Sequence, residues 1–238
     1  MGLGARLNGM MLTGRRPGSA SSGGGGGSVL LNFAPKADQT PYDPTGDGWV
    51  EDDSAGSSAN ITSGRWRVPT TGFQSIHAPM AVLDLNGETK TFVEVKDLEV
   101  DGNTTDGFAM VIISNYTPGA WNVGTYATLD GYWVQIGGFG NEMRAFIRRI
   151  NSGAQTFLTG GIFAGVDVDS GNFHDVRLEI DTTSGDAEID LKVDNVSQLA
   201  TTDSTGSKIT SFRTVALCLE YSGSFPSGVS AIDAGPFA

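Results

Sequence analysis

Residues 173–194 read FHDVRLEIDTTSGDAEIDLKVD and hold the plainest structural pattern of the chain. In 173–181 apolar and charged side chains alternate, and the alternation returns in 186–194 after the turn residues Thr-Thr-Ser-Gly. Successive side chains of a strand point to opposite faces, so each segment has one apolar and one polar face. The stretch therefore predicts an antiparallel hairpin with one face on a core and the other in water.

Strand-like texture continues on both sides of this hairpin. Apolar segments at 91–100, 107–113, 132–136, 142–150 and 213–221 predict further strands, and 213–221 is expected to be the last long one. The segment at 107–113 is apolar on both faces, which is typical of a buried central strand. Helical periodicity is lacking. The pattern predicts an all-β fold, with about a dozen strands in an antiparallel two-sheet jelly-roll sandwich.

The first 28 residues have a different composition from the rest. They contain ten glycines, three arginines and no acid, whereas residues 29–238 carry 12 Lys and Arg against all 27 Asp and Glu, a formal charge of −15. Glycine loses the most backbone entropy on ordering, and this segment has little apolar surface to offset that loss. We therefore expect an extended, Gly-rich basic anchoring arm at 1–28 and a β-sandwich at 29–238.

Composition also excludes several classes of function. An acidic body disfavours nucleic acid as a partner, because phosphate binding needs clustered Lys and Arg. No apolar run approaches the ~20 residues that span a bilayer, so membrane insertion is not expected. With two histidines and one cysteine, zinc sites and Cys/His dyads are excluded. His174 is expected to be a hydrogen-bonded core histidine, and Cys218 a buried thiol.

Four segments, in order, resemble the concanavalin-like jelly roll of legume-type lectins and laminin G modules. Residues 105–112 (TDGFAMVI) resemble the Ala-Asp-Gly-x-Ala-Phe strand of the lectins. Residues 131–136 (GYWVQI) follow, then 172–179 (NFHDVRLE), similar to Gly-x-Trp-His-x-Val-Arg, and 190–195 (DLKVDN), similar to Leu-x-Val-Asp-Gly. The resemblance implies a lectin-like sandwich with a sugar-binding role.

A ligand site is expected around Asp106, Tyr116, Trp121 and Asn122. Asp106 matches the lectin aspartate that accepts hydrogen bonds from sugar hydroxyls. The loop at 115–122 adds aromatic rings beside amide and hydroxyl groups, and a sugar can stack on such rings. The alternative is that Trp121 covers the edge of the core. The loop has no acid, so the metal-ligand run of the lectins has no counterpart here.

Calcium is the only cofactor that the sequence leaves open. The segments 43–47 (DPTGD) and 167–172 (DVDSGN) gather oxygen donors in tight turns, with metal-free Asx-turns as the alternative. We expect no cofactor, and calcium remains the alternative.

Carboxylate pairs are the candidates for catalysis. Glu99-Val-Asp101 and Glu188-Ile-Asp190 resemble parts of the Glu-x-Asp-x-x-Glu signature of glucanases that share this fold, but neither has the final glutamate. Glu188 and Asp190 also fall on the polar face of the hairpin. No catalytic residue and no enzyme activity are therefore expected, and a glycan hydrolase of the same fold is the alternative.

The arm resembles the N-terminal segments of minor virion proteins of tailed bacteriophages. This resemblance implies a virion structural or appendage protein, such as a tail fiber or capsid decoration protein. The arm would dock on other virion proteins, and the lectin-like domain would face outward, as a homo-oligomer, toward a host-surface glycan for host attachment. A purely structural capsid decoration protein is an alternative.

Overall fold

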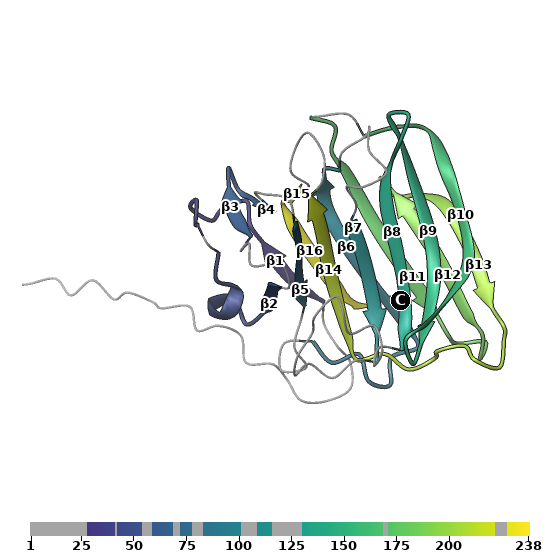
Figure 1. Cartoon of the computed structure of the whole chain (residues 1–238). Coiled ribbons are helices and arrows are strands. Elements are labelled where there is room, and N and C mark those ends of the chain that lie inside the picture. Colours follow the sequence, from purple (N-terminus) through teal and green to yellow (C-terminus); the bar gives the residue numbers. More distant parts are fainter. Residues whose placement is uncertain are drawn as a thin grey trace, which may run out of the picture.

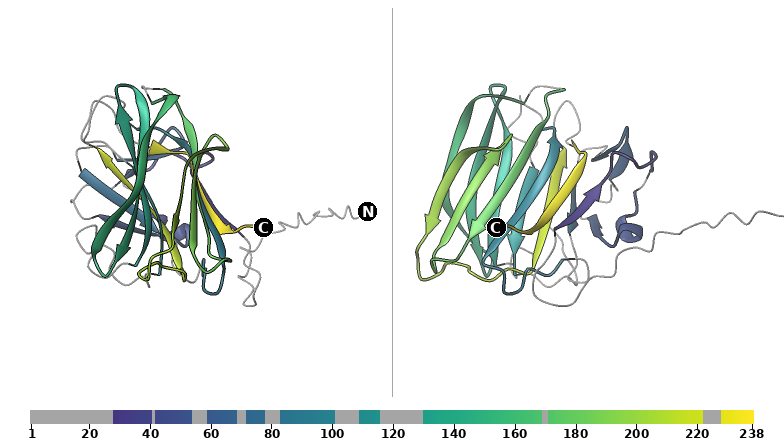
Figure 2. Two further views of the ribbon diagram at one scale, coloured as in Figure 1. Left: turned by 90° about the vertical axis from the view of Figure 1, so that its right-hand side faces the viewer. Right: turned by 180° about the vertical axis from the view of Figure 1, so that it is seen from behind.

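The computed structural model shows two antiparallel β-sheets stacked face to face, with a small third sheet at one end (Figures 1 and 2). The predicted all-β, antiparallel jelly-roll sandwich is confirmed. The structure describes residues 28–40, 42–53, 59–68, 72–77, 83–100, 109–115, 130–168, 171–221 and 228–238. The predicted anchoring arm at 1–28 therefore lies outside the described residues, apart from Ser28.

The first large sheet has seven strands and lies in front in Figure 1. In spatial order they are β10 (Ala154–Asp167), β9 (Glu142–Asn151), β8 (Gly131–Phe139), β7 (Ala109–Ser114), β14 (Thr214–Tyr221), β5 (Gly72–His77) and β2 (Val50–Asp53). The predicted central strand, β7, pairs with β8 on one side and β14 on the other. Its described side chains are buried on both faces, as predicted.

The second large sheet has six strands and lies behind the first. In spatial order they are β1 (Val29–Asn32), β16 (Ala231–Pro236), β6 (Lys90–Leu98), β11 (His174–Asp181), β12 (Ala187–Val193) and β13 (Val196–Asp203). The third sheet has the order β15 (Gly228–Val229), β4 (Arg65–Arg67) and β3 (Asn60–Thr62), and a 3₁₀ turn, η1, covers Pro44–Asp47. Among the described residues, no helix has the length and apolar character needed to cross a bilayer.

The predicted hairpin of residues 173–194 is confirmed in its antiparallel pairing and in its two faces. β11 and β12 pair antiparallel, with Val176 opposite Val193 and Ile180 opposite Ile189. Val176, Leu178 and Ile180 are fully buried, whereas the alternate charged residues are partly exposed. The buried side chains join Val111, Val134 and Ile147 of the other sheet in one apolar core.

Two-residue turns fix the register of the neighbouring hairpins. Gly140 and Asn141 connect β8 to β9 with φ of 58° and 71°, and Ser152 and Gly153 connect β9 to β10 with φ of 47° and 80°. Positive φ at both central residues is the type I′ geometry, which matches the twist of paired strands. These turns hold β8, β9 and β10 as one continuous ribbon.

A buried polar cluster joins the two sheets beside this ribbon. Arg149 of β9 contacts both carboxylate oxygens of Asp203 of β13, at 2.9 and 2.8 Å, and the Tyr132 hydroxyl of β8 donates to Asp203 at 2.9 Å. The Asp203 side chain is fully buried. Burial alone would favour the neutral acid, but hydrogen bonds from Thr205, Arg149 and Tyr132 hold the pKa of Asp203 below its ordinary value.

Nine of the sixteen described strands fall in no predicted segment, and β10, β13 and β16 are three of them. β10 contains several glycines, and its alternation is broken by an irregularity between Phe157 and Thr159. β13 is rich in Ser and Thr, and β16 contains Gly and Pro, which disfavour strands. The expectation that 213–221 is the last long strand is therefore wrong, because β16 follows it and pairs with both β1 and β6.

Candidate functional site

The outer face of β8, β9 and β10 carries an unusual set of side chains. Along β9, Met143, Ala145 and Ile147 are fully buried in the core, so Arg144, Phe146 and Arg148 point away from it. Paired residues of neighbouring strands share a face. The register therefore places Trp133, Arg148 and Phe157 in one cross-strand row, Gln135, Phe146 and Gly160 in a second, and Gly137, Arg144 and Ile162 in a third.

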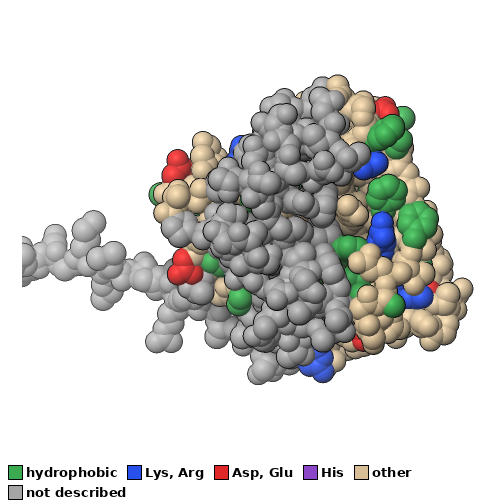
Figure 3. Space-filling model, in the orientation of Figure 1, with side chains coloured by type: hydrophobic (Ala, Val, Ile, Leu, Met, Phe, Trp, Pro, Cys, Tyr) green, Lys and Arg blue, Asp and Glu red, His purple; other side chains and the backbone are tan. Residues whose placement is uncertain are grey.

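We call the side chains of these rows, together with Phe139 at the end of β8, the aromatic–arginine face; its Trp133 is buried, at 5% exposure. Phe157 is 57% exposed, Phe139 54% and Ile162 49%. Large apolar side chains gathered at such exposure mark a binding surface more often than isolated ones do. Figure 3 shows apolar and basic side chains side by side over this part of the seven-stranded sheet.

A glycine gives the face its close ring packing. A Cβ atom added to Gly160 would lie 2.4 Å from Cδ1 of Phe146 on the neighbouring strand. The Phe146 ring therefore rests against the backbone of β10 at a position where only glycine leaves room. It also meets Phe157, with ring centroids 6.2 Å apart and planes inclined by 58°. The result is a low aromatic platform on the sheet.

The two arginines of the face lie against these rings. The Arg144 guanidinium carbon is 5.7 Å from the centroid of Phe139 and 5.4 Å from that of Phe146. The corresponding carbon of Arg148 is 6.0 Å from the Trp133 ring, and Arg148 donates a long hydrogen bond of 3.4 Å to Gln155. Cation–π contacts of this kind hold a guanidinium near a ring while its donors remain directed outward.

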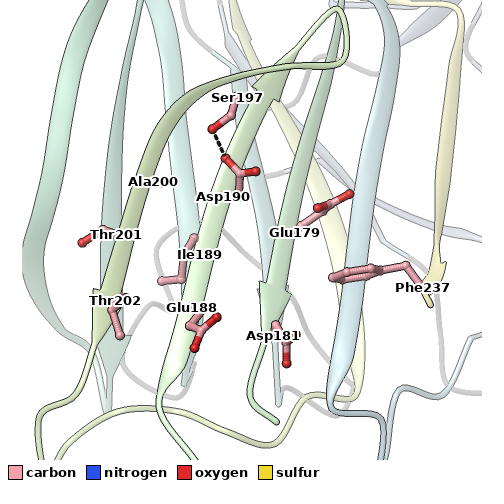
Figure 4. A pocket seen from close by; sticks show the side chains of 10 residues that line it. All are labelled: Glu179, Asp181, Glu188, Ile189, Asp190, Ser197, Ala200, Thr201, Thr202 and Phe237. Atoms are coloured by element: carbon pink, nitrogen blue, oxygen red, sulfur yellow. Dashed lines mark hydrogen bonds between the residues drawn. The ribbon is translucent and has the colours of Figure 1, made fainter. Parts of the chain in front are cut away.

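A groove of about 500 Å³ lies on the outer face of the six-stranded sheet. Its lining is Glu179, Asp181, Glu188, Ile189, Asp190, Ser197, Ala200, Thr201, Thr202 and Phe237 (Figure 4). The groove thus contains four carboxylates, including the pair Glu188 and Asp190 that the sequence places on the polar side of the hairpin. Ser197 donates to Asp190 at 2.6 Å, and Ser184 donates to Glu188 at 3.1 Å.

Glu179 of this groove is held as an anion by two cations. Lys192 and Arg177 contact Glu179 at 2.5 and 2.6 Å. Burial opposes ionisation, yet these two hydrogen bonds keep the pKa of Glu179 below its ordinary value. Hydrolysis of a glycosidic bond needs one carboxyl group with a raised pKa to act as the acid. Glu179 does not meet that need.

One carboxylate pair that the sequence analysis did not single out lies near this groove. Asp233 of β16 and Glu94 of β6 are directly opposite each other in the register. Burial and the negative charge of Glu94 raise the pKa of Asp233. Glu94 is itself contacted by Lys96 at 2.6 Å and by Arg177 at 3.5 Å. Neither Asp233 nor Glu94 lines the groove, so we assign the pair no catalytic role.

The other sequence candidates have structural partners. Glu99 is buried and binds Arg67 at 3.0 Å. Asp47 accepts hydrogen bonds of 2.6 Å from both Lys36 and Tyr42, so the turn at 43–47 is an ion-paired one. His174 is hydrogen-bonded, as predicted: its ring nitrogens lie 2.7 Å from an Asp194 carboxylate oxygen and from the Asp167 carbonyl oxygen.

Two further predictions concern the thiol and the metal. Cys218 is fully buried, as predicted. Within the described ranges, no three His, Cys, Asp or Glu side chains are arranged to hold a metal ion.

The predicted ligand residues Asp106, Tyr116, Trp121 and Asn122 lie outside the described residues. They flank β7, whose described ends are Ala109 and Ser114. Their grouping into one site stays a prediction. The sequence analysis missed the aromatic–arginine face, although the alternation of Arg144, Phe146 and Arg148 with apolar residues could have indicated it.

Comparison with known proteins finds similar structures but no similar sequences. No protein-family model and no curated protein matches the sequence. The structure is similar to the carbohydrate recognition domain of Emp47p, with a TM-score of 0.65 at 10% identity, covering 89% of this chain and 95% of that one. It is also similar to a legume lectin-like domain from Entamoeba histolytica, with a TM-score of 0.59 at 11% identity over 87% and 97% of the two chains.

A third similar structure was solved with a bound sugar. The exoplasmic/lumenal domain of VIP36, in its Ca²⁺/Man3GlcNAc-bound form, matches with a TM-score of 0.54 at 12% identity over 80% of this chain and 84% of that one. At these identities the likeness establishes the fold alone. This chain therefore has the concanavalin-like lectin fold that the sequence segments predict.

Proposed function

We propose that this lectin-fold sandwich is a non-enzymatic glycan-binding module and that the aromatic–arginine face forms part of its binding surface. The observation that carries the proposal is the exposure of Phe139 and Phe157 beside Phe146 on one sheet face. Two solved structures of this fold support it: that of Emp47p is named a carbohydrate recognition domain, and that of VIP36 is a Man3GlcNAc-bound form.

Sugar chemistry suits this surface. The C–H groups of a pyranose ring stack on an aromatic ring, while its hydroxyl groups need directional polar partners, which Gln135 and the arginines supply on the same face. Each contact competes with water, so the affinity of one site is expected to be weak. Adhesion of useful strength then needs several copies acting together.

A glycan array probed with multivalent full-length protein tests this function. We expect wild type to bind and Phe157→Ser to bind weakly. Val196→Ser is the matched control, because Val196 is 56% exposed on β13 of the other sheet. Trp121→Ala and Asp106→Ala test the predicted loop site in the same experiment. Absence of wild-type binding would favour a purely structural protein, and equal binding by Phe157→Ser and wild type would place the site elsewhere.

The biological setting that we propose is a phage virion. The support is the charge contrast between the basic arm at 1–28 and the acidic remainder, together with the resemblance of the arm to those of minor virion proteins. In this setting the arm docks on other virion proteins, and the sandwich presents its glycan site outward. Deleting residues 1–28 should leave a folded sandwich that no longer associates with the particle. Incorporation at normal copy number would contradict the anchoring role.

A further inference from the structure

Most Lys and Arg side chains in the described part of this acidic chain are paired with carboxylates. In the described residues, nine Lys and Arg side chains form ion pairs: Lys36, Arg65, Arg67, Lys90, Lys96, Arg149, Arg177, Lys192 and Lys208. Arg144 and Arg148 have no carboxylate within 4.0 Å in the part of the chain that the structure describes. Both belong to the aromatic–arginine face.

The described outer faces of the two sheets therefore differ in charge, although Glu142 lies opposite Phe139 at the end of the aromatic–arginine face. The groove on the six-stranded sheet has four carboxylates along its lining, and the cations near it are already paired. The aromatic–arginine face instead offers two guanidinium groups held against rings. Because the chain outside the arm has a formal charge of −15, this face is a local exception that an anion can recognise.

The spacing of the two arginines favours an extended ligand. Arg144 and Arg148 are four residues apart on one strand, which separates their Cα atoms by about 13 Å. Phe146 lies between them on the same face. The Arg144 guanidinium lies against Phe139 and Phe146 and that of Arg148 against Trp133, so an oligosaccharide that stacks on the central ring can reach both.

We propose that the aromatic–arginine face binds an acidic oligosaccharide whose sugars bear carboxylates, with Arg144 and Arg148 each pairing with one carboxylate. Planar guanidinium groups match carboxylates bidentately, and the rings supply the stacking that a simple anion would not use. The inference names the ligand class of the proposed glycan-binding function and rests on it. Single-stranded nucleic acid also combines bases with phosphates, but two arginines on an acidic body make a poor footprint for it.

The test is titration calorimetry of full-length protein with matched ligands. An oligogalacturonate is compared with its methyl ester, which lacks the free carboxylates. Sialyllactose is compared with lactose, which lacks the sugar that carries the carboxylate. Oligothymidylate tests the nucleic-acid alternative. The variants are Arg144→Gln and Arg148→Gln, and Lys90→Gln is the control, because Lys90 is paired with Asp181 and lies 5.8 Å from the Phe237 ring on the other sheet. Thermal melts confirm that each variant folds.

We expect at least one acidic ligand to bind more tightly than its neutral partner. Each arginine variant should lose about tenfold in affinity, as for a charged hydrogen bond, while Lys90→Gln binds like wild type. Added NaCl should weaken binding.

Three results would overturn the inference: equal binding of acidic and neutral partners, unchanged affinity in both arginine variants, or tighter binding of oligothymidylate than of the acidic sugars. If only neutral sugars bind, the glycan-binding function stands and the proposed acidic ligand class is wrong. If no sugar binds in calorimetry or on the array, both the acidic ligand class and the glycan-binding function are wrong.

Discussion

Replacing Arg149 by Met should strongly destabilise the sandwich. Arg149 contacts both oxygens of Asp203 at 2.9 and 2.8 Å, and the exposed fractions of the two side chains are 9% and 0%. Removing one partner of a buried ion pair leaves an uncompensated charge and costs about 3–5 kcal/mol. For a domain of this size, each kcal/mol lowers the melting temperature by roughly 2–4 °C, so a fall of roughly 6–20 °C is expected.

The matched variant is the double substitution Arg149→Met with Asp203→Asn. Asparagine is uncharged and keeps an oxygen that can accept the hydrogen bond of Tyr132. The double variant should therefore be more stable than Arg149→Met alone. Urea denaturation followed by tryptophan fluorescence measures both free energies of unfolding. The reasoning is refuted if Arg149→Met unfolds within about 0.5 kcal/mol of wild type, the usual range for a surface substitution.

The ion pair of Arg149 and Asp203 also makes the free energy of unfolding depend on pH in acid. The pKa of Asp203 is lowered in the folded state, so its contribution is present above the pKa of an unfolded aspartate, about 3.9, and is lost as the pH falls through the folded value. In Arg149→Met the carboxylate has lost its cation and this contribution is reduced. The stability difference between wild type and Arg149→Met should shrink as the solution is acidified below about pH 4.

Three further predictions follow from buried or crowded positions. Ile112→Asp would bury an unpaired charge at a fully buried site of β7 and should cost several kcal/mol; an unchanged melting temperature would contradict the central placement of β7. Asp233→Asn should stabilise the protein at neutral pH. The pKa of Asp233 is raised in the folded state, so its ionised form destabilises the fold above that pKa. This destabilisation disappears as the pH falls through the raised pKa, so the gain of Asp233→Asn over wild type should vanish in acid. Gly160→Ala should displace the Phe146 ring and weaken glycan binding on the array; wild-type binding would show that the ring platform is not used.

The sequence predicts the sandwich where strands alternate cleanly. The β11–β12 hairpin is predicted by its alternation of apolar and charged residues, and β7 by its continuous apolar run. β16 could not be predicted in this way, because its Gly235 and Pro236 argue against a strand, and its place between β1 and β6 depends on pairing across most of the chain length.

The candidate site was harder to predict than the fold. The sequence of β9 shows that Arg144, Phe146 and Arg148 alternate with apolar residues. Their partners Phe157, Gly160 and Ile162 lie on β10, where a shift in register interrupts the alternation of inward and outward side chains. That no described carboxylate pairs with Arg144 or Arg148 depends on where the carboxylates of the chain lie in space. The predicted loop site at Asp106, Tyr116, Trp121 and Asn122 remains a prediction.

A crystal structure with a glycan selected on the array would locate the bound sugar. We expect density for a sugar ring stacked over Phe146 or Phe157, with a carboxylate within hydrogen-bond distance of Arg144 or Arg148. A sugar seated in the groove of the six-stranded sheet, or on any surface away from β8, β9 and β10, would contradict this expectation.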